Sequence, residues 1–523
     1  MTTDIDIACL ADITRAHAAA RPNAVALVYQ GRETTYRELD ERASRVANGL
    51  IAAGLGPQAR VAYLDKNSDR FFEVLFGAAK ANQVIVAVNW RLAPPEVAYI
   101  INDAMAEALF VGQEFFPVIE KILPELRTVK TVIAIDAPHE GWQYYPEWRD
   151  ARSAEDPRVP SGEDDVAIQM YTSGTTGHPK GAQLTNGNFF ALLPGAVRSW
   201  GPRWSENDVN LVVMPLFHIA GSGWGIVGLY AGAKDIVLRD VVPAEILKVI
   251  PEYRVTRAIF VPAVLLFLLQ TPGVQETDFS SLQFIAYGAS PIPLDLLRNA
   301  VATFKCQFAQ LYGLTETTGA VTYLPPEDHD PNGNPRMRSC GKPLPGVELR
   351  IVDPEGRDLP AGEVGEIICR SKQVMKGYWN LPEETAKAIR DGWFYTGDAG
   401  YMDADGYVYI YDRVKDMIVS GGENVYPAEV ESALFGHPAV ADVAVIGVPD
   451  DKWGEAVKAI VVKKPGMDVT PEELIAFARE RIAGYKVPKS IDFAEALPRN
   501  PSGKILKREL RAPYWAGRER QVN

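Results

Sequence analysis

A short loop rich in glycine and hydroxyl side chains constrains this chain of 523 residues more than any other feature. The loop runs Tyr171-Thr-Ser-Gly-Thr-Thr-Gly-His-Pro-Lys-Gly181 and contains three glycines, four serine or threonine hydroxyl groups and one lysine. Glycines let backbone N–H groups approach an anion, hydroxyl groups donate further hydrogen bonds, and Lys180 adds a positive charge. The loop is therefore predicted to bind a polyphosphate.

The residues before this loop favour a strand. Residues 166–170 form an apolar run, and α/β proteins bind ligands at the carboxyl ends of such strands. The spacing differs from that of a Walker A loop, because Gly174 and Gly177 are only three residues apart. Lys180 is also followed by glycine instead of serine or threonine. We therefore expect a phosphate loop of another kind, and a polar surface loop without a ligand is the less favoured alternative.

Four further motifs follow along the chain. They are Tyr312-Gly-Leu-Thr-Glu-Thr-Thr-Gly319, Tyr395-Thr-Gly-Asp398, Asp412-Arg-Val-Lys-Asp-Met-Ile-Val-Ser-Gly-Gly-Glu-Asn424 and Pro498-Arg-Asn-Pro-Ser-Gly-Lys504. In content and in order, the five motifs resemble the signatures of the adenylate-forming superfamily. This superfamily contains acyl-CoA synthetases, luciferases and the adenylation domains of nonribosomal peptide synthetases. The resemblance covers essentially the whole chain and is greatest to fatty-acyl-CoA synthetases.

Composition excludes several other classes of protein. The chain carries 67 acidic and 54 basic residues, for a net charge of −13, which argues against broad binding to nucleic acid or to anionic membranes. Its four cysteines form no C-x-x-C pair and its six histidines form no H-E-x-x-H motif. Neither a zinc site nor a disulfide framework is therefore indicated.

No segment of the sequence predicts a membrane span or a secretory signal. The longest apolar run, 258–269, has 12 residues and contains Pro262, whereas about 18 apolar residues are needed to cross a bilayer. The N-terminus lacks the charged start and apolar stretch of a signal peptide. A cytoplasmic location is expected, and a homodimer is left open.

The pattern of the first 310 residues is typical of parallel α/β sheets, because short β-rich runs alternate with helical patterns. A capping box at Thr35–Glu38 and the apolar stripe after it predict one helix, which Gly54 ends. From about 341 to 411, glycine-punctuated alternating segments predict antiparallel strands, including a hairpin from Tyr401 to Tyr409 around Asp405-Gly406. Strands of the first region are expected at 84–88, 108–111, 131–135, 236–238, 257–261 and 284–287.

After Arg413 the sequence predicts a small α+β unit. Its strands are expected at 441–448 and 456–462, and Thr470 opens a helix that runs to Ala483. The resemblance implies an ATP- and acyl-binding domain over 1–413 and a mobile domain over 414–523. The predicted fold is thus α/β, with a large N-terminal domain of α/β sheets, a β-rich subdomain and a small mobile α+β C-terminal domain.

The resemblance implies which residues bind the phosphates of ATP and Mg²⁺. Thr315 and Glu316 would act on the α-phosphate and on Mg²⁺, and a carboxylate beside phosphates requires a hard cation between them. Without the resemblance, Glu316 would be interpreted as a surface charge. The β- and γ-phosphates would be held by Thr172, Ser173, Gly174, Thr175, Thr176, Gly177 and Lys180.

The same resemblance implies a site for the nucleoside. Tyr312 would stack on adenine, and Asp398 and Arg413 would bind the ribose. From the residues alone, Tyr312 would be interpreted as a packed core residue, and Asp398 could equally be a turn-stabilising side chain. The adenine pocket would be lined by Gly288, Ala289 and Ser290.

A second group of residues would take part in catalysis and in binding CoA. Lys504 would bridge the substrate carboxylate and the α-phosphate, which stabilises the charge that develops there. A lysine in a basic tail would otherwise be expected in solvent. The remaining implied roles are a domain hinge at Lys415, a pantetheine tunnel along Gly421 and Gly422, and a contact to a CoA phosphate from Lys486.

His218 marks the expected acyl site. The resemblance places it beside the acyl carboxylate, although a lone histidine on an apolar segment could equally be a core residue. The small residues 219–223 behind it predict an open tunnel for an apolar acid, and they favour a medium- or long-chain fatty acid over an aryl acid. The alternative is that these glycines only allow close helix packing.

These features together predict an ATP-dependent acyl-CoA synthetase. A small carboxylic acid would react with ATP to give an acyl-adenylate and pyrophosphate, and the thiol of CoA would then displace AMP. The alternatives are an aryl-acid or other acid–CoA ligase, an adenylation enzyme that loads a carrier protein, and a non-catalytic nucleotide sensor. CoA is preferred because no carrier-like domain is seen, and a sensor could dispense with Lys504 and Glu316.

Overall fold

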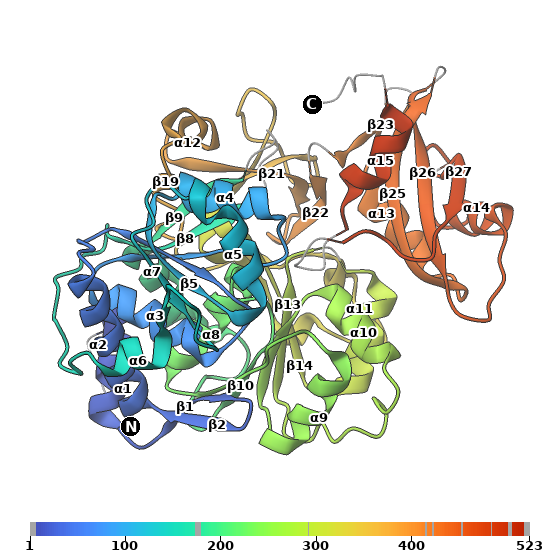
Figure 1. Ribbon diagram of the computed structural model, residues 1–523. Helices are drawn as coiled ribbons and strands as arrows, with labels where there is room; N and C mark the ends of the chain where they lie inside the picture. Colours follow the sequence, from blue (N-terminus) through green and yellow to red (C-terminus); the bar gives the residue numbers. More distant parts are fainter. Residues whose placement is uncertain are drawn as a thin grey trace.

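The computed structural model describes residues 7–172, 179–290, 292–413, 416–420, 423–450, 453–482, 484–499 and 505–516. Two large sheets flanked by helices make up most of the chain, and a smaller antiparallel sheet follows them (Figure 1). The elements from β23 onward form a separate unit, coloured orange to red in Figure 1. The predicted α/β fold with a β-rich part and a small C-terminal α+β unit is confirmed.

The first large sheet has nine strands and is parallel from β1 to β14. Strands β2, β15 and β16 pair antiparallel at its two edges. In spatial order the strands are β16 (Lys342–Pro343), β15 (Gly319–Leu324), β14 (Gln307–Leu314), β13 (Phe284–Gly288), β12 (Arg257–Phe260), β10 (Val209–Val212), β11 (Lys234–Val237), β1 (Val25–Tyr29) and β2 (Arg32–Thr35).

The second large sheet has eight strands and carries the predicted phosphate loop after β8. Its central strands are parallel, whereas β9 and β19 pair antiparallel at one edge. The order is β19 (Gly377–Tyr378), β9 (Lys180–Thr185), β8 (Val166–Thr172), β4 (Val84–Ala87), β3 (Arg60–Leu64), β5 (Ala106–Val111), β6 (Thr131–Ala134) and β7 (Gln143–Tyr144).

Helices of this part of the chain cover the two sheets (Figure 1). They are α1 (Leu10–Ala20), α2 (Tyr36–Ala52), α3 (Asp69–Lys80), α4 (Pro94–Asp103), α5 (Phe116–Ile122), α6 (Tyr145–Asp150), α7 (Asn186–Ser199), α8 (Ile219–Ala231), α9 (Pro243–Tyr253), α10 (Pro262–Gln270) and α11 (Leu294–Phe304). The capping box predicted for α2 is present, because Thr35 accepts from the backbone of Glu38 and the Glu38 side chain accepts from that of Thr35.

Two glycines let α8 pack closely, Gly228 against the first sheet and Gly225 against helix α3. A Cβ atom on Gly228 would lie 2.2 Å from Oδ1 of Asp235, and one on Gly225 would lie 2.6 Å from the ring of Phe72. Asp235 of β11 is fully buried, and its Oδ1 atom accepts a hydrogen bond of 2.9 Å from Asn210. Burial raises the pKa of Asp235 well above its usual range.

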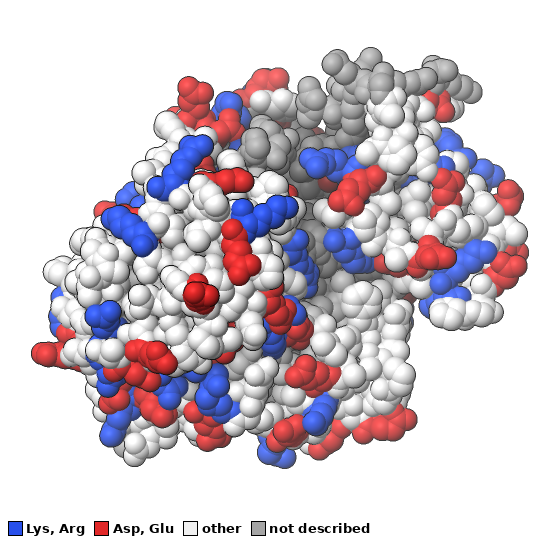
Figure 2. All heavy atoms as spheres, in the orientation of Figure 1, with Lys and Arg blue, Asp and Glu red and all other residues white. Residues whose placement is uncertain are grey.

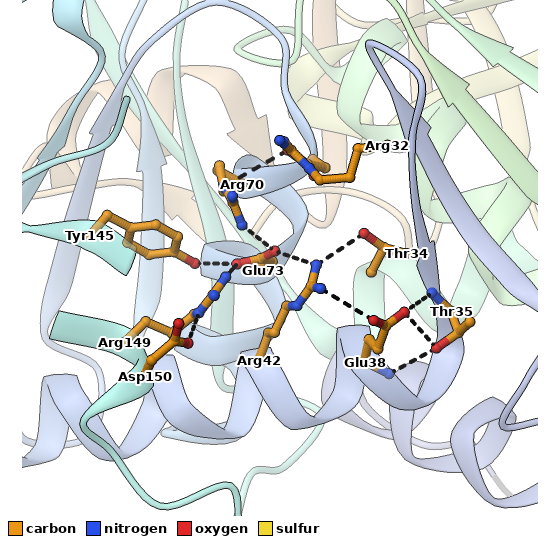
Figure 3. Close-up of polar contacts among 11 residues, drawn as sticks. Arg32, Thr34, Thr35, Glu38, Arg42, Arg70, Glu73, Tyr145, Arg149 and Asp150 are labelled. Atoms are coloured by element: carbon orange, nitrogen blue, oxygen red, sulfur yellow. Dashed lines mark hydrogen bonds and ion pairs between the residues drawn. The ribbon is translucent and has the colours of Figure 1, made fainter. Parts of the chain in front are cut away.

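A buried carboxylate ties α2, α3 and α6 together (Figure 3). Glu73 of α3 is fully buried and accepts hydrogen bonds from Arg70 at 2.9 Å, Arg149 at 2.8 Å and the Tyr145 hydroxyl at 2.5 Å. Arg42 of α2 adds a contact of 3.4 Å. Burial alone would raise the pKa of Glu73, but the charges of the surrounding arginines lower it, so Glu73 is ionised.

The third sheet contains the antiparallel strands predicted between 341 and 411. Its strands are β17 (Glu348–Val352), β18 (Gly365–Arg370), β21 (Trp393–Met402), β20 (Ile389–Arg390) and β22 (Val408–Arg413). The predicted hairpin is confirmed, because Tyr401 pairs with Tyr409 across it. Two elements of this region were not predicted: strand β19 leaves to pair with β9, and helix α12 spans Pro382–Ala388.

The C-terminal unit has its own sheet and its own apolar core. The core draws on buried residues between Ile418 and Ile491. The predicted helix at 470–483 is shorter than expected, because α14 ends at Arg479. The elements are β23 (Ile418–Ser420), β24 (Glu423–Val425), α13 (Pro427–Phe435), β25 (Val440–Asp450), β26 (Gly454–Lys463), α14 (Pro471–Arg479), β27 (Ser490–Phe493) and α15 (Lys507–Trp515). The boundary at 413–414 stays a prediction.

On the face drawn in Figure 2, Lys and Arg side chains are interspersed with Asp and Glu side chains. In the part of the chain that the structure describes, no helix is long and apolar enough to cross a membrane.

Candidate active site

Strands β8 and β9 form the hairpin that carries the predicted phosphate loop. Tyr171 pairs with Gly181 and Thr172 pairs with Lys180, so the loop begins at the carboxyl end of β8, as the sequence predicted. Thr172 and Lys180 are both half-buried at the base of the loop. The predicted ligands Ser173, Gly174, Thr175, Thr176 and Gly177 lie outside the described residues.

A carboxylate from the second motif meets the base of this loop. Glu316 lies in the short 3₁₀ helix η3 (Thr315–Thr317) and is only 8% exposed. Its Oε1 atom accepts a hydrogen bond of 3.1 Å from the Thr172 hydroxyl and one of 2.9 Å from the Tyr378 hydroxyl. Thr315, the residue before it, is half-buried. The structure thus brings together residues predicted from two motifs 144 positions apart.

The remaining hydroxyl groups of the second motif hold its turn. Thr317 accepts from the backbone N–H of Leu314, and the hydroxyl of the fully buried Thr318 donates to the carbonyl of Gln373. A Cβ atom on Gly313 would lie 1.7 Å from the carbonyl oxygen of Gly319, so glycine is required there. These contacts fix the turn that carries Glu316.

Lys180 is paired with a carboxylate that the sequence did not single out. Its ammonium group forms an ion pair with Glu384 of α12 and lies 5.2 Å from the centre of the Tyr378 ring. Tyr378 therefore contacts both Lys180 and Glu316. We refer to Thr172, Lys180, Glu316 and Tyr378 as the phosphate end of the site. Of these, only Tyr378 was absent from the sequence prediction.

The residues predicted to bind the nucleoside also lie together. The hydroxyl of Tyr312 donates a hydrogen bond of 2.8 Å to Oδ2 of Asp398, and both residues are buried. Burial and then the charge of Asp398 raise the pKa of Tyr312 well above its usual range, so the phenol keeps its proton. Asp398 of β21 pairs with Arg413 of the neighbouring strand β22. The Asp398 carboxylate is held by a tyrosine beside the place where ribose is predicted.

The segment predicted to line the adenine pocket ends strand β13. A Cβ atom on Gly288 would lie 2.1 Å from the carbonyl oxygen of Leu311, so the close approach of β13 and β14 requires glycine. Ala289 follows with a φ of +68° and is exposed, and Ser290 is half-buried. Ala289 therefore adopts a left-handed backbone conformation directly after β13.

His218 lies at the N-terminus of α8, beside an apolar and partly exposed surface. Its Nε2 atom has no hydrogen-bond partner among the described residues. Burial, and then the nearby charge of Arg91, lowers the pKa of His218 to about 4, so the ring is neutral near pH 7. Ile219, Ala220 and Gly223 behind it are half-buried. A neutral ring with an unpaired nitrogen fits a residue that faces a ligand better than a satisfied core residue.

The small residues after His218 serve two different purposes. A Cβ atom on Gly221 would lie 2.4 Å from the carbonyl oxygen of Met214 and 2.2 Å from that of Pro215, so Gly221 allows close helix packing. Close packing of this kind is the alternative to an open acyl tunnel behind His218. At Gly223, by contrast, the nearest atoms are those of the Ile219 side chain at 3.3 and 3.5 Å. Gly223 therefore faces more open space than Gly221.

The other predicted residues lie in or near the C-terminal unit. Lys504, Lys415, Gly421 and Gly422 lie outside the described residues, and their roles stay predictions. Lys486 forms an ion pair with Glu429, with its ammonium nitrogen 2.7 and 2.8 Å from the two carboxylate oxygens. A phosphate of CoA would share this ammonium group with Glu429.

The phosphate end has donor groups that suit Mg²⁺. No group of three or more His, Cys, Asp or Glu side chains that could hold a metal ion occurs among the described residues. Mg²⁺ commonly uses one or two carboxylates together with substrate phosphates and water. Glu316 alone therefore fits this ion only when a polyphosphate is bound beside it.

Comparisons with known proteins identify the family of the chain. The family model described as AMP-binding enzyme matches residues 14–379, and that described as AMP-binding enzyme C-terminal domain matches residues 429–504. The chain is 43% identical to the fatty acid–[acyl-carrier-protein] ligase ScoC of Streptomyces coeruleorubidus, over 98% of each chain. It is 39% identical to the long-chain-fatty-acid–CoA ligase FadD13 of Mycobacterium tuberculosis, over 92% of this chain and 93% of the other.

A solved structure is also similar over nearly the whole length. The anthranilate CoA ligase AuaEII in complex with anthranoyl-AMP has a TM-score of 0.91 and 31% sequence identity, and 97% of each chain is covered. These proteins are named as ligases that join an acid to CoA or to a carrier protein, and the prediction of an acid–thiol ligase is confirmed at that level. The family matches and the full-length relatives together show that the chain belongs to the AMP-binding enzyme family of adenylate-forming ligases.

Proposed function

We propose that this protein activates a medium- or long-chain fatty acid with ATP and transfers the acyl group to the thiol of CoA. The proposal rests on one observation: the short segment 316–319 contacts the polar phosphate end at its start and apolar side chains at its end. Glu316 at one end of this segment belongs to the phosphate end. Gly319, three residues later, lies beside Ile219, with an ideal Cβ atom 4.0 Å from that side chain.

The first step forms an acyl-adenylate. A carboxylate oxygen of the acid attacks the α-phosphorus of ATP, the bond from that phosphorus to the bridging oxygen breaks, and pyrophosphate leaves. Thr172 and Tyr378 hold the Glu316 carboxylate by hydrogen bonds, and Lys180 adds a positive charge for the departing phosphates. Bound Mg²⁺ would supply further neutralisation of phosphate charge at Glu316. Lys504 is proposed to bridge the two reacting groups.

The acid itself would lie between His218 and Glu316. A neutral His218 can hydrogen-bond to the acid through its unpaired Nε2 atom without adding a charge to the apolar surface behind it. Asp398 is an acceptor for the ribose hydroxyl groups, and Tyr312 holds it in place. In the second step the thiol sulfur bonds to the acyl carbon, the bond from that carbon to the phosphate oxygen breaks, AMP leaves, and the thiol proton passes to water.

The half-buried apolar surface at Ile219, Ala220 and Gly223 supports an aliphatic acid. Each methylene buried there should contribute about 0.8 kcal/mol, so kcat/KM should rise roughly fourfold per added CH₂ until the space is full. We expect Gly223→Leu to shorten this series, because the new side chain fills space beside Ile219. The measurement is kcat/KM for saturated acids of increasing length, with benzoate and coumarate for comparison.

Gly195→Leu is the matched control for that experiment. Gly195 is an exposed glycine inside α7, and a Cβ atom there would meet nothing within 4 Å. Its variant should keep the chain-length series of the wild-type protein. A flat series, or an aryl acid preferred over every fatty acid, would contradict the proposed acyl specificity.

A carrier protein is the second candidate for the thiol acceptor. The relative ScoC, 43% identical over 98% of both chains, is named for an acyl-carrier-protein substrate. The two acceptors are distinguished by mixing the fatty acid and ATP with either CoA or a phosphopantetheinylated carrier protein. We expect the thioester of CoA; formation of the carrier thioester alone would assign the acceptor instead to the carrier protein.

A further inference from the structure

Glu384 pairs with Lys180 at the place where this lysine is expected to meet phosphate. Both side chains are largely shielded, with 13% of Lys180 and 21% of Glu384 exposed. Lys387 contacts the other carboxylate oxygen of Glu384 at 2.7 Å. Hydrogen bonds from Lys180 and then from Lys387 lower the pKa of Glu384 to about 2, so the carboxylate is charged near pH 7. Lys180 therefore already has an anionic partner before any nucleotide binds.

The helix that carries Glu384 is anchored to the hairpin of the phosphate loop. Strand β19 pairs with β9, with Tyr378 opposite Ala182. The hydroxyl of Thr385 accepts a hydrogen bond of 2.9 Å from the backbone N–H of Tyr378 and donates one of 2.9 Å to the carbonyl of Leu381. Through these contacts β19 and the first turn of α12 form one unit with β9. The position of Glu384 relative to Lys180 is thus set by the fold.

The charges around Lys180 cannot all be satisfied when a polyphosphate is bound. ATP or pyrophosphate brings several negative charges to the lysine, and an ionised Glu384 in contact with the same ammonium group would repel them. The ammonium can instead leave Glu384 for the phosphate, and Lys387, which is 69% exposed, remains as a partner for the carboxylate. The exchange leaves neither charged group without a partner.

We propose that Glu384 is a positioning residue that holds Lys180 while the phosphate end is empty and takes it back as pyrophosphate departs. The inference rests on the proposed function, because it assigns Lys180 to the phosphates of ATP. Glu384 would then weaken the binding of pyrophosphate and favour its release. This weaker binding of pyrophosphate would come from the ion pair between Glu384 and Lys180, and not from the general negative charge of the surface.

The test compares binding of magnesium pyrophosphate to the full-length wild-type protein and to two variants by titration calorimetry. Glu384→Gln removes the charge that pairs with Lys180, and we expect pyrophosphate to bind about two- to fivefold more tightly, the range of a partly exposed ion pair. The neighbouring Glu383→Gln is the matched control, because Glu383 is an exposed glutamate of the same helix turn. Its variant should bind as the wild type does.

Two further measurements separate positioning from a structural effect. In Glu384→Gln, product inhibition by pyrophosphate should strengthen and KM for ATP should fall without a rise in kcat. In a Lys180→Met background, the same substitution should no longer tighten pyrophosphate binding. The inference would be overturned if Glu384→Gln bound pyrophosphate no more tightly than the wild type, or if the substitution tightened binding equally in the Lys180→Met background. Neither result would contradict the proposed function. A wild-type protein that binds neither ATP nor pyrophosphate would contradict the proposed function as well.

Discussion

Replacing Glu316 by glutamine is expected to slow acyl-adenylate formation by about 10²–10³-fold, the scale of losing one preorganised electrostatic group at a reacting centre. Glutamine keeps the shape of the side chain and an oxygen that can accept from Thr172 and Tyr378. It loses the negative charge that Mg²⁺ requires beside the phosphates. The loss should appear in the rate of acid-dependent ATP–pyrophosphate exchange, together with a raised requirement for Mg²⁺.

Glu363→Gln provides the control for this loss. Glu363 is an exposed glutamate before β18, and its replacement makes the same change in net charge. Its exchange rate should match that of the wild-type protein. An exchange rate of Glu316→Gln within a few fold of the control would show that the carboxylate does not act on the phosphates.

Replacing Glu73 by glutamine is expected to destabilise the N-terminal part of the chain by about 3–5 kcal/mol, since breaking a buried ion pair leaves uncompensated charge in the core. Arg70 and Arg149 approach this carboxylate within 2.9 Å, and the Tyr145 hydroxyl also donates to it (Figure 3). Glutamine preserves packing volume but cannot neutralise the arginines. The measurement is the free energy of unfolding from urea denaturation at pH 7.

Acid should diminish this difference between the wild type and Glu73→Gln. The pKa of Glu73 is lowered in the folded protein, so the stability it contributes is present above the unfolded value of 4.5 and is lost as pH falls through the folded value. Glu41→Gln, at an exposed position of α2, should leave the unfolding free energy unchanged within about 0.5 kcal/mol. If Glu73→Gln is as stable as Glu41→Gln at pH 7, the buried network does not stabilise the fold.

Local signals in the sequence were sufficient for much of the fold. The capping box at Thr35 and Glu38 and the hydrophobic stripe after it predict α2, and both signals lie within one helix. The Asp405-Gly406 turn likewise fixes the hairpin in which Tyr401 faces Tyr409. The family motifs then indicated that distant segments meet, as Thr172 and Glu316 do.

Contacts that depend on non-local pairing could not be predicted in this way. Tyr378 lies in a strand of two residues that pairs with β9, nearly 200 positions earlier, and two residues are too few to show a period. Glu384 has the sequence signature of a solvated helix charge, although it contacts Lys180. Gly221 and Gly223 look alike in sequence, and only the rotation of α8 shows that the first faces the backbone of Met214.

The proposed formation of an acyl-adenylate from ATP is tested by the products of the complete reaction. Purified protein is incubated with ATP, Mg²⁺, CoA and a saturated fatty acid, and the nucleotides and phosphates are separated. We expect AMP and pyrophosphate in amounts equal to that of the thioester, and acid-dependent exchange of pyrophosphate into ATP when CoA is omitted. ADP and orthophosphate as the sole products would contradict it.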